Sequence, residues 1–388
     1  MMADPNPIKV KVIDPAAFTL VYDHALAQSL AERGLSVELV TSHFPFSAMP
    51  PQRGYEVGLR FYRHRFGPSG SRRERFGRLS QHSFDMLMLA RHANVDEILH
   101  FQWFALQELD VYIRPRKAPI VFTAHDLLPR EPRPGQLSAQ RRLLRKVDAI
   151  IVHYKAGRAR LLEMGFPSGK IHVIPIGAYR HQAELASPAP LSRELAAVKG
   201  PVVLFFGLIR PNKGLDVLLE AWRGITNAEL WVVGQPRMEM ADLRRMAPTG
   251  VRFISRWLNE NELPAIFQRA DLVVLPYREI DQSGVAFTAL AFGRPLLLSD
   301  AGGFPDIAEL GAAHLVPAGD PAALGRALRR LIADDGKRRA LAHAALEAAA
   351  GPLSWHTIAK QTEVVYRSVL ARRGAPASQR SGLSRPGR

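Results

Sequence analysis

The sequence predicts an α/β protein with two Rossmann-like domains, each built on a doubly wound parallel sheet, facing each other across a cleft. Three observations lead to this fold class. The chain has 388 residues, which is enough for two or three domains. Short apolar runs alternate with segments of helical periodicity, as βαβ units require. This alternation occurs in two series, separated by a stretch rich in Ala, Pro and Ser.

The first series begins near the N-terminus. Lys9–Ile13 reads as a strand, Asp23–Arg33 as a helix that Gly34 ends, and Val37–Thr41 as the next strand. Further strands of the apolar kind that parallel sheets bury are expected at Ile98–Phe101, Ile120–Thr123 and Ala149–His153.

The second series repeats the pattern with shorter spacing. Its first strand is Val202–Phe206, followed by a helix from Leu215 to Trp222. The later strands are expected at Leu230–Val233, Val251–Phe253, Leu272–Leu275, Leu296–Ser299 and His314–Val316. Helices are expected at Glu260–Arg269, Ala286–Phe292 and Ala322–Ala333.

These series set the predicted domain boundaries. We expect an N-terminal domain over 1–180, a linker over 181–200 and a C-terminal domain over 201–350. A last amphipathic helix falls within 351–371. The Gly-, Ser-, Pro- and Arg-rich residues 372–388 are expected to form a disordered basic tail.

Composition excludes several classes of protein and site. The 47% hydrophobic and 23% charged residues are ordinary for a globular protein. The absence of Cys excludes disulfides, Cys-ligated zinc, iron–sulfur clusters and thiol nucleophiles. No window reaches the roughly 18 apolar residues of a membrane span, and no signal-peptide pattern opens the chain. The expected location is therefore cytoplasmic, either free or peripheral at the inner face of the membrane through the basic N-terminal half.

Charge is the unusual property of this chain, at +16. Residues 1–200 hold 28 Lys and Arg against 18 Asp and Glu, whereas 201–350 hold 17 of each. A basic first half suits an acidic partner such as nucleic acid, anionic lipid or a phosphorylated small molecule, or simply serves solubility. The helix expected over Arg72–His92 either lies on an anionic membrane face or is a domain helix with a solvated Arg face.

The strongest local motif follows the strand Val202–Phe206. Gly207, Arg210 and Lys213 occupy a loop that leads into a helix. A helix start offers free N–H groups, Arg a bidentate fork and Lys a point charge, and together these suit a diphosphate. The alternative is an Arg and a Lys exposed on an ordinary loop.

A second loop of this kind follows the strand Leu272–Leu275. Asp281, Ser283 and Gly284 lead into a helix that begins at about Val285. Its free N–H groups can also receive phosphate, and Gly284 permits close approach. Plain helix capping by Asp281 and Ser283 is the simpler interpretation.

In order and spacing these motifs resemble the GT-B retaining glycosyltransferases of the group 1 and family 4 type. The resemblance is specific over roughly residues 200–335 and looser before them. It rests on Gly207–Arg210–Lys213–Gly214, on ADLVVLP at 270–276, on Ala289–Gly293–Pro295 and on GGFPD at 302–306.

The resemblance implies transfer of a sugar from a nucleoside-diphosphate sugar to an acceptor, with the anomeric configuration kept. The nucleotide sugar is a co-substrate, and neither cofactor nor metal is expected. By resemblance, Arg210 and Lys213 hold the diphosphate and neutralise the leaving group, while the N–H groups of Gly284 and Val285 hold the distal phosphate or sugar. An acidic or lipid-linked acceptor fits the basic N-terminal half.

One departure from the family pattern concerns a carboxylate. The Glu that the family often uses for the ribose hydroxyls is replaced by Thr288, which can supply one hydrogen bond in its place. Asp281 is the expected contact with the sugar hydroxyls. The resemblance places the nucleobase near Ile254 and Arg256, whereas Trp257 is expected to be packed.

On the acceptor side, the resemblance points to the loops after N-terminal strands. His125 follows a buried strand and would meet the donor sugar, or else makes a structural bond at the strand end. The loop after the first strand lacks the usual glycines, and its Phe18, Thr19 and Tyr22 are the acceptor-side candidates. Asp23 either reaches the acceptor or caps the helix.

The last helix, Trp355–Leu370, resembles the family's C-terminal segment, which crosses back onto the first domain. Trp355 and Tyr366 are then expected to be packing anchors.

Three other functions compete with glycosyl transfer. A nucleotide-sugar epimerase uses the same two-domain fold. A nucleic-acid-binding protein would account for the charge, but the chain offers no reader helix and no aromatic–basic RNA motif. A degraded transferase that only binds a partner would account for Thr288.

Overall fold

The computed structural model divides the chain into two compact units, each described here by itself. It describes residues 7–43, 53–64, 71–129, 132–185 and 187–374. The N-terminal unit comprises 1–153, 158–175 and 355–388, and the C-terminal unit comprises 154–157 and 176–354. The stretch predicted as a linker, 181–200, therefore lies inside the C-terminal unit, where it carries two short helices.

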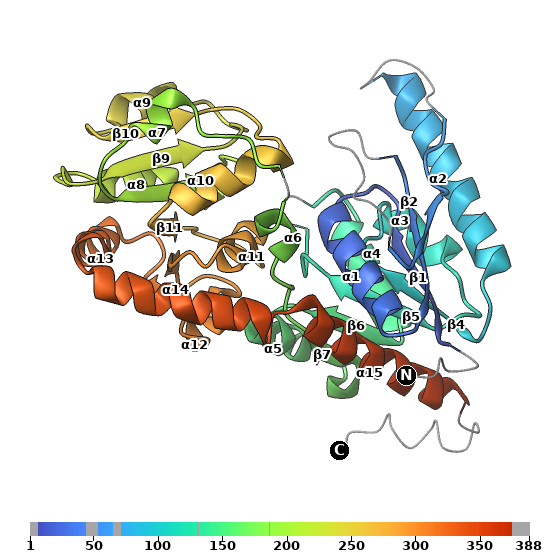
Figure 1. Ribbon diagram of the computed structural model, residues 1–388. Coiled ribbons are helices and arrows are strands. Elements are labelled where there is room, and N and C mark those ends of the chain that lie inside the picture. Colours follow the sequence, from blue (N-terminus) through green and yellow to red (C-terminus); the bar gives the residue numbers. More distant parts are fainter. Residues whose placement is uncertain (1–6, 44–52, 65–70, 130–131, 186, 375–388) are drawn as a thin grey trace. The chain divides into compact units, whose positions relative to one another are not determined.

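The N-terminal unit is built on a seven-stranded parallel sheet in the order β3-β2-β1-β4-β5-β6-β7 (Figure 1). Its strands are β1 (Lys9–Asp14), β2 (Ser36–Thr41), β3 (Glu56–Leu59), β4 (Glu97–Phe101), β5 (Ile120–Ala124), β6 (Ala149–Val152) and β7 (Ile171–Val173). Every residue of β4, β5 and β6 is buried, as their continuous apolar sequences predict. Strands β3 and β7 were not predicted, because edge strands this short carry little periodicity.

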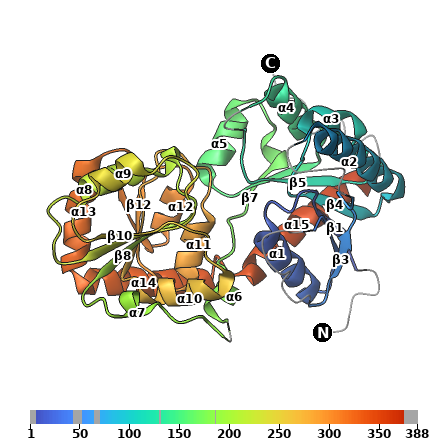
Figure 2. The same ribbon diagram turned by 90° about the horizontal axis from the view of Figure 1, so that it is seen from above.

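Helices flank this sheet, and the last of them comes from the far end of the chain. They are α1 (Leu20–Glu32), α2 (Arg72–His92), α3 (Gln107–Ile113), α4 (Gln136–Lys146), α5 (Lys155–Glu163), the 3-10 turn η1 (Ser168–Lys170) and α15 (Trp355–Gly374). Helix α15 packs against α1 (Figure 2), where Arg33 forms an ion pair of 2.6 Å with Glu363. The expected return of the last helix to the first domain is confirmed. Residues 375–388 of the predicted tail lie outside the described residues.

The C-terminal unit contains a six-stranded parallel sheet in the order β10-β9-β8-β11-β12-β13. Its strands are β8 (Val202–Phe206), β9 (Glu229–Val233), β10 (Val251–Ile254), β11 (Leu272–Leu275), β12 (Leu296–Ser299) and β13 (Ala313–Val316). All six were predicted to within one residue at each end. The large side chains of Trp222, Trp231 and Phe205 are fully buried in its core.

Helices cover both faces of this sheet as well. They are α6 (Arg180–Ala183), α7 (Arg193–Ala196), α8 (Leu215–Ala221), α9 (Ala241–Met246), α10 (Leu263–Arg269), α11 (Gly284–Ala291), α12 (Phe304–Glu309), α13 (Pro321–Ala333) and α14 (Asp335–Ala350), with 3-10 turns η2 (Pro211–Lys213) and η3 (Glu260–Glu262). Helix α8 packs against α13, and α11 against α14 (Figure 2).

In each sheet, the direction in which successive strands are added reverses once. The positions of these two reversals locate the candidate sites. In the N-terminal unit the chain runs outward from β1 to β3 and then returns to place β4 beside β1. In the C-terminal unit it runs outward from β8 to β10 and returns to place β11 beside β8. Loops separate at such switch points and leave a crevice at the carboxyl ends of the strands, where α/β proteins bind ligands. Among the described residues, no helix has the length and apolar character needed to span a membrane.

Candidate active site

The two loops at the C-terminal switch point are joined to each other. The loop Gly207–Gly214 follows β8, and the loop Pro276–Ser283 follows β11. The backbone N–H of Arg278 donates to the carbonyl of Asn212 at 2.9 Å, and Asn212 Nδ2 donates to the carbonyl of Glu279 at 3.1 Å. The two motifs singled out in the sequence therefore form one continuous surface.

Gly214 makes this approach possible. It adopts φ +65°, and a Cβ atom there would lie 2.0 Å from the carbonyl oxygen of Pro276. Only glycine fits a position where one backbone passes so close to another. The Lys–Gly pair of the motif is thus explained by the contact between the two loops.

Lys213 lies over an aromatic ring of the second loop. Its Nζ atom is 3.7 Å from the ring centroid of Tyr277, a side chain that is almost completely buried. Burial raises the pKa of Tyr277 to about 12, so the phenol is neutral at pH 7. A cation over a neutral ring is stabilised without losing its charge. Arg210, the other predicted cation of the loop, is exposed.

The side chains of the second loop contact other elements of the same unit. Asp281 Oδ1 accepts a hydrogen bond of 2.5 Å from the Tyr154 hydroxyl, and its carbonyl accepts from the N–H of Gly303, in the loop after β12. Ser283 Oγ is 3.5 Å from Tyr277 Oη and makes no capping bond to α11, which begins at Gly284. The capping interpretation of Ser283 is wrong, because its hydroxyl is turned toward Tyr277.

Thr288, which replaces the family's Glu, is buried and paired with a neighbour. Its hydroxyl donates to Gln182 Oε1 at 3.0 Å, and Gln182 on α6 is also buried. Two neutral groups therefore satisfy each other where the family often has a carboxylate. The hydroxyl oxygen of Thr288 retains its capacity to accept a hydrogen bond.

The residues expected near a nucleobase do not contact one another as the residues of the two loops do. Ile254 ends β10, and its carbonyl accepts from the N–H of Gly234 at 3.0 Å. Arg256 binds both carboxylate oxygens of Glu262, at 3.0 and 2.5 Å, and this pairing lowers the pKa of Glu262. Trp257 is 53% exposed, so the expectation of a packed Trp is wrong.

A second cluster forms at the switch point of the N-terminal unit. His125, in the loop after β5, stacks on Trp103 with ring centroids 5.4 Å apart and meets the edge of Tyr22 at 4.8 Å. Its Nε2 atom is 2.9 Å from Gln102 Oε1, and its Nδ1 atom is 3.2 Å from His153 Nε2. The loops after neighbouring strands β4, β5 and β6 supply these groups.

The histidines of this cluster are neutral. Burial, together with the neighbouring His153 and His100, holds the pKa of His125 well below its usual range. Burial also lowers the pKa of His153 to about 4 and, with a small contribution from His153, that of His100 to about 3. At pH 7 each ring therefore carries one proton, and its two nitrogens differ in role.

The carbonyl of Ile174 decides those roles. It lies 2.9 Å from His153 Nδ1 and can only accept, so that nitrogen carries the proton. Neutral His153 then accepts at Nε2. Gln102 Oε1, 2.9 Å from His125 Nε2, can also only accept, so two acceptors compete for the single proton of the neutral His125 ring. Both ring nitrogens of His125 have protein partners, as the structural interpretation of this residue predicts.

The loop after β1 contains a buried carboxyl pair beside the acceptor-side candidates. Thr19 donates its N–H to Asp14 Oδ2 at 2.9 Å. Burial, the charge of Asp14 and a hydrogen bond with it raise the pKa of Asp23 well above its usual range. Asp23 lies inside α1 and does not cap it, because Thr19 precedes the helix. Phe18 is exposed, and Tyr22 is buried.

Sequence reasoning missed several members of this cluster: Asp14, Gln102, Trp103 and His153. Each lies at or just after the end of a strand, which is the signal that could have identified them. Among the described residues, no group of three or more His, Asp or Glu side chains is arranged to hold a metal ion.

Two family models match the chain. Residues 21–178 match Glycosyltransferase Family 4, and residues 200–334 match Glycosyl transferases group 1. Together the two ranges span most of both units.

Curated relatives and solved structures resemble the chain over most of its length. It is 26% identical to the D-inositol 3-phosphate glycosyltransferase of Kineococcus radiotolerans, over 92% of this chain and 91% of the relative. It is 33% identical to the phosphatidyl-myo-inositol mannosyltransferase of Mycobacterium leprae, over 44% of this chain and 47% of that one. HepE of Anabaena, in complex with UDP-glucose, superposes with a TM-score of 0.72 at 17% identity, covering 93% of this chain and 99% of that one. The sucrose-phosphate synthase of Thermosynechococcus elongatus gives 0.70 at 20% identity, covering 94% and 99%.

Proposed function

The chain belongs to the glycosyltransferases, with a family 4 domain followed by a group 1 domain in the GT-B fold, and from this premise we propose its reaction. It transfers a sugar from a nucleoside-diphosphate sugar to an acceptor, with retention at the anomeric carbon and without a metal ion. The observation that carries this proposal is the junction of the loops after β8 and β11, which brings Lys213 beside the loop that starts α11.

The diphosphate is assigned to this junction. Lys213 supplies a charge fixed in direction by Tyr277, and Arg210 supplies an exposed guanidinium on the same loop. The N–H groups of Gly284 and Val285, at the first turn of α11, have no partner within the helix and suit phosphate oxygens. As the bond to the sugar breaks, negative charge grows on the diphosphate, and these groups stabilise it most in the transition state.

The remaining donor contacts are assigned to the same unit. Asp281, fixed by Tyr154, receives hydrogen bonds from sugar hydroxyls. Ser283 adds a polar contact to the same loop. The Thr288 hydroxyl accepts one ribose hydrogen bond while it donates to Gln182. Ile254 and Arg256 border the nucleobase, and Arg256 serves as a fixed wall because Glu262 holds it.

The cluster of the N-terminal unit is assigned to the donor sugar and the acceptor. Neutral His125 forms a hydrogen bond with a sugar hydroxyl through Nε2, in place of its contact with Gln102 Oε1. Phe18, Thr19 and Tyr22 border the acceptor. Relatives named D-inositol 3-phosphate glycosyltransferases make a phosphorylated polyol the first acceptor to test, and a lipid-linked acceptor the second. Such a reaction draws on cytoplasmic nucleotide sugars.

A ligand screen followed by product analysis tests the proposal. UDP, GDP, ADP and their sugars are added to the protein, and the unfolding temperature is measured. A nucleotide at about 100 times its Kd adds about 2.7 kcal/mol to the stability, a shift of several degrees. UDP-sugars are the first candidates, because HepE was solved with UDP-glucose.

The product then identifies the reaction. Proton NMR of the glycoside formed with inositol phosphate is expected to give the anomeric configuration of the donor. Interconversion of the nucleotide sugar without acceptor would instead establish an epimerase. A protein that no nucleotide stabilises would contradict the proposal.

A further inference from the structure

Helix α2 of the N-terminal unit exposes four large apolar side chains. Phe76 is 72% exposed, Leu79 44%, Phe84 56% and Leu87 52%. At 100° per residue, Phe76, Leu79 and Leu87 lie on the side of the helix turned away from the sheet, and Phe84 lies at the edge of that side. We call this set the α2 outer face. An exposed apolar group of this size on one helix marks an interaction surface.

The inner side of α2 is already fully used by the fold. His82 is completely buried, with Nε2 2.6 Å from Asp110 Oδ1 and Nδ1 2.8 Å from the Tyr62 hydroxyl. Asp85 accepts the N–H of Tyr62 at 3.2 Å, and Met86 is buried beside it. The helix is therefore fixed in rotation, and the outer face is left without a role in the core.

The same helix is strongly basic on its exposed side. Arg72, Arg73 and Arg91 are exposed and form no ion pair with any residue in the described part of the chain. Arg75 is also exposed, whereas Arg78 lies on the opposite side of the helix, 5.0 Å from the ring centroid of Tyr62. The acidic residues lie off the outer face as well, since Asp85 is buried and Glu74 is only half exposed. The three arginines named above therefore share the outer side with the apolar side chains, and no acidic side chain lies between them.

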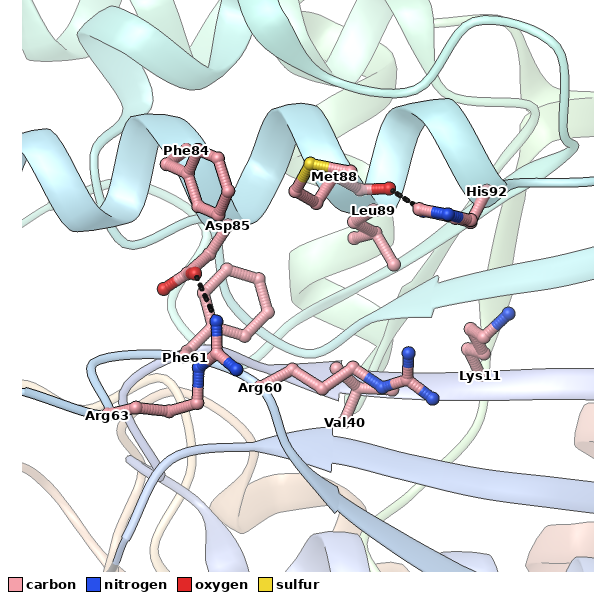
Figure 3. A pocket seen from close by; sticks show the side chains of 10 residues that line it. All are labelled: Lys11, Val40, Arg60, Phe61, Arg63, Phe84, Asp85, Met88, Leu89 and His92. Atoms are coloured by element: carbon pink, nitrogen blue, oxygen red, sulfur yellow. Dashed lines mark hydrogen bonds and ion pairs between the residues drawn. The ribbon is translucent and has the colours of Figure 1, made fainter.

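A hollow of about 350 Å³ adjoins the outer face (Figure 3). Phe84, which belongs to the outer face, forms part of its wall with Phe61, Met88 and Leu89. In the figure, Arg60 and Arg63 lie across the hollow from α2. Their charges are partly compensated, since Arg60 pairs with Glu38 and Arg63 lies 3.8 Å from Asp85. The hollow therefore adds apolar surface to the α2 outer face but adds little uncompensated positive charge.

We propose that the α2 outer face docks on an anionic phospholipid bilayer. The helix lies in the plane of the interface, Phe76 and Leu87 insert among the acyl chains, and the arginines contact lipid phosphates. A helix of 21 residues is about 30 Å long, which suits the multiple shallow contacts of an interfacial helix. This inference goes beyond the proposed reaction and does not depend on it.

Charge decides between a bilayer and a second copy of the chain. An interface between two copies related by a two-fold axis would place the arginines of one α2 against those of the other. The arginines of the two copies would repel each other, because no acidic side chain lies between them, and this opposes a dimer through α2. An anionic bilayer offers hydrocarbon and negative charge together, and each basic residue near such a surface contributes to binding.

Site-specific labelling tests the orientation, because the chain has no Cys of its own. The Phe76→Cys variant is labelled with a polarity-sensitive fluorophore and mixed with vesicles of 30% phosphatidylglycerol in phosphatidylcholine. Its emission is expected to shift to shorter wavelength, and spin-labelled lipids should quench it. Val364→Cys, labelled at an exposed apolar position on α15, is the matched control and should not respond.

Co-sedimentation with the same vesicles measures the affinity. Phe76→Ser combined with Leu87→Ser, and Arg72→Gln combined with Arg73→Gln and Arg91→Gln, should each lower the partition coefficient at least about tenfold. The charge-matched control combines Arg223→Gln, Arg326→Gln and Arg329→Gln, three exposed arginines of the C-terminal unit, and should bind as the unchanged protein does. Donor hydrolysis should be the same in all of them, which verifies folding.

Three results would overturn the proposal. They are equal binding to pure phosphatidylcholine, equal loss in the control variant, and a dimer in solution that Phe76→Ser dissociates while vesicles bind no protein. Because the donor assay is independent, failure of vesicle binding leaves the proposed reaction standing, and failure of the reaction leaves the docking surface standing.

Discussion

Lys213 is a single side chain on which the proposed chemistry depends. Its ammonium group lies over the ring of Tyr277, and that ring is neutral, so this contact does not cancel the charge of Lys213. An aspartate or glutamate in the same place would have held Lys213 equally well but would have cancelled its charge. The contact with Tyr277 thus orients a cation without neutralising it.

Replacing Lys213 tests this assignment. Lys213→Ala should lower kcat/KM by about 10²- to 10³-fold, because a group that stabilises charge in the transition state is lost. Arg210→Ala should also reduce turnover. The unfolding temperature should change little in both, and Lys199→Ala, at an exposed position of the same unit, should behave as the unchanged enzyme. Full activity in Lys213→Ala and Arg210→Ala would remove the diphosphate from this loop.

The buried histidines make a second prediction at this scale. His153 has a pKa of about 4 in the folded chain, against 6.5 for an unperturbed histidine. Between pH 4 and 6.5 the unfolded chain binds more protons at this position than the folded chain does. The contribution of His153 to the free energy of unfolding is therefore complete above pH 6.5 and is lost as the pH falls toward 4. The contribution is up to about 3 kcal/mol.

Denaturant unfolding at a series of pH values measures this effect. The slope of unfolding free energy against pH between 4 and 6.5 should be smaller in His153→Gln than in the unchanged protein. His343→Gln, on the exposed side of α14, is the control and should keep the slope. Equal slopes in all three proteins would mean that His153 is protonated in the fold.

At the scale of elements, the loops after β8 and β11 depend on each other. The loop after β8 passes close to the end of β11 at Gly214. A hydrogen bond from the Arg278 N–H to the Asn212 carbonyl and one from Asn212 Nδ2 to the Glu279 carbonyl join the two loops. The first turn of α11 is positioned by the same contacts. A distortion of one loop is therefore expected to move the other, and with it the N–H groups proposed to bind phosphate.

Gly214→Ala tests this dependence. Its Cβ would lie 2.0 Å from the Pro276 carbonyl, and φ is +65°. We expect a loss of about 2–4 kcal/mol in unfolding free energy, since both strain and a steric clash are introduced. Gly224→Ala is the matched control, with φ +78° and open space around the added atom, and should cost about 1 kcal/mol. Equal losses in the two variants would mean that the loops can separate without cost.

At the scale of the whole molecule, positive charge replaces a metal ion in the proposed reaction. The net charge of +16 lies outside residues 201–350, so the proposed diphosphate site depends on Lys213, Arg210 and the start of α11 rather than on the charge of its domain. Transfer rates with EDTA and with added Mg²⁺ should therefore agree within about twofold, as measured by release of nucleoside diphosphate. Restoration of activity by Mg²⁺ after chelation would contradict metal independence.

Much of the fold could be read from the sequence. The apolar runs at Val202–Phe206 and Leu272–Leu275 are too short for helices and too apolar for exposed loops, so their assignment as buried parallel strands follows directly. The loops Gly207–Lys213 and Asp281–Gly284 were identifiable because glycine, cations and a helix start follow such strands. The short edge strands β3 and β7 were missed, since three or four residues give no period.

The sequence by itself determined two doubly wound sheets, their strand positions and the loops that carry the candidate chemistry, because burial and helical periodicity are local properties of the chain. Only the tertiary structure decided which side chains meet: Lys213 with Tyr277, Thr288 with Gln182, and His125 with Gln102 and His153. These contacts join residues that are distant in the sequence. Their partners and protonation states depend on which strands become neighbours and on how completely each group is removed from water.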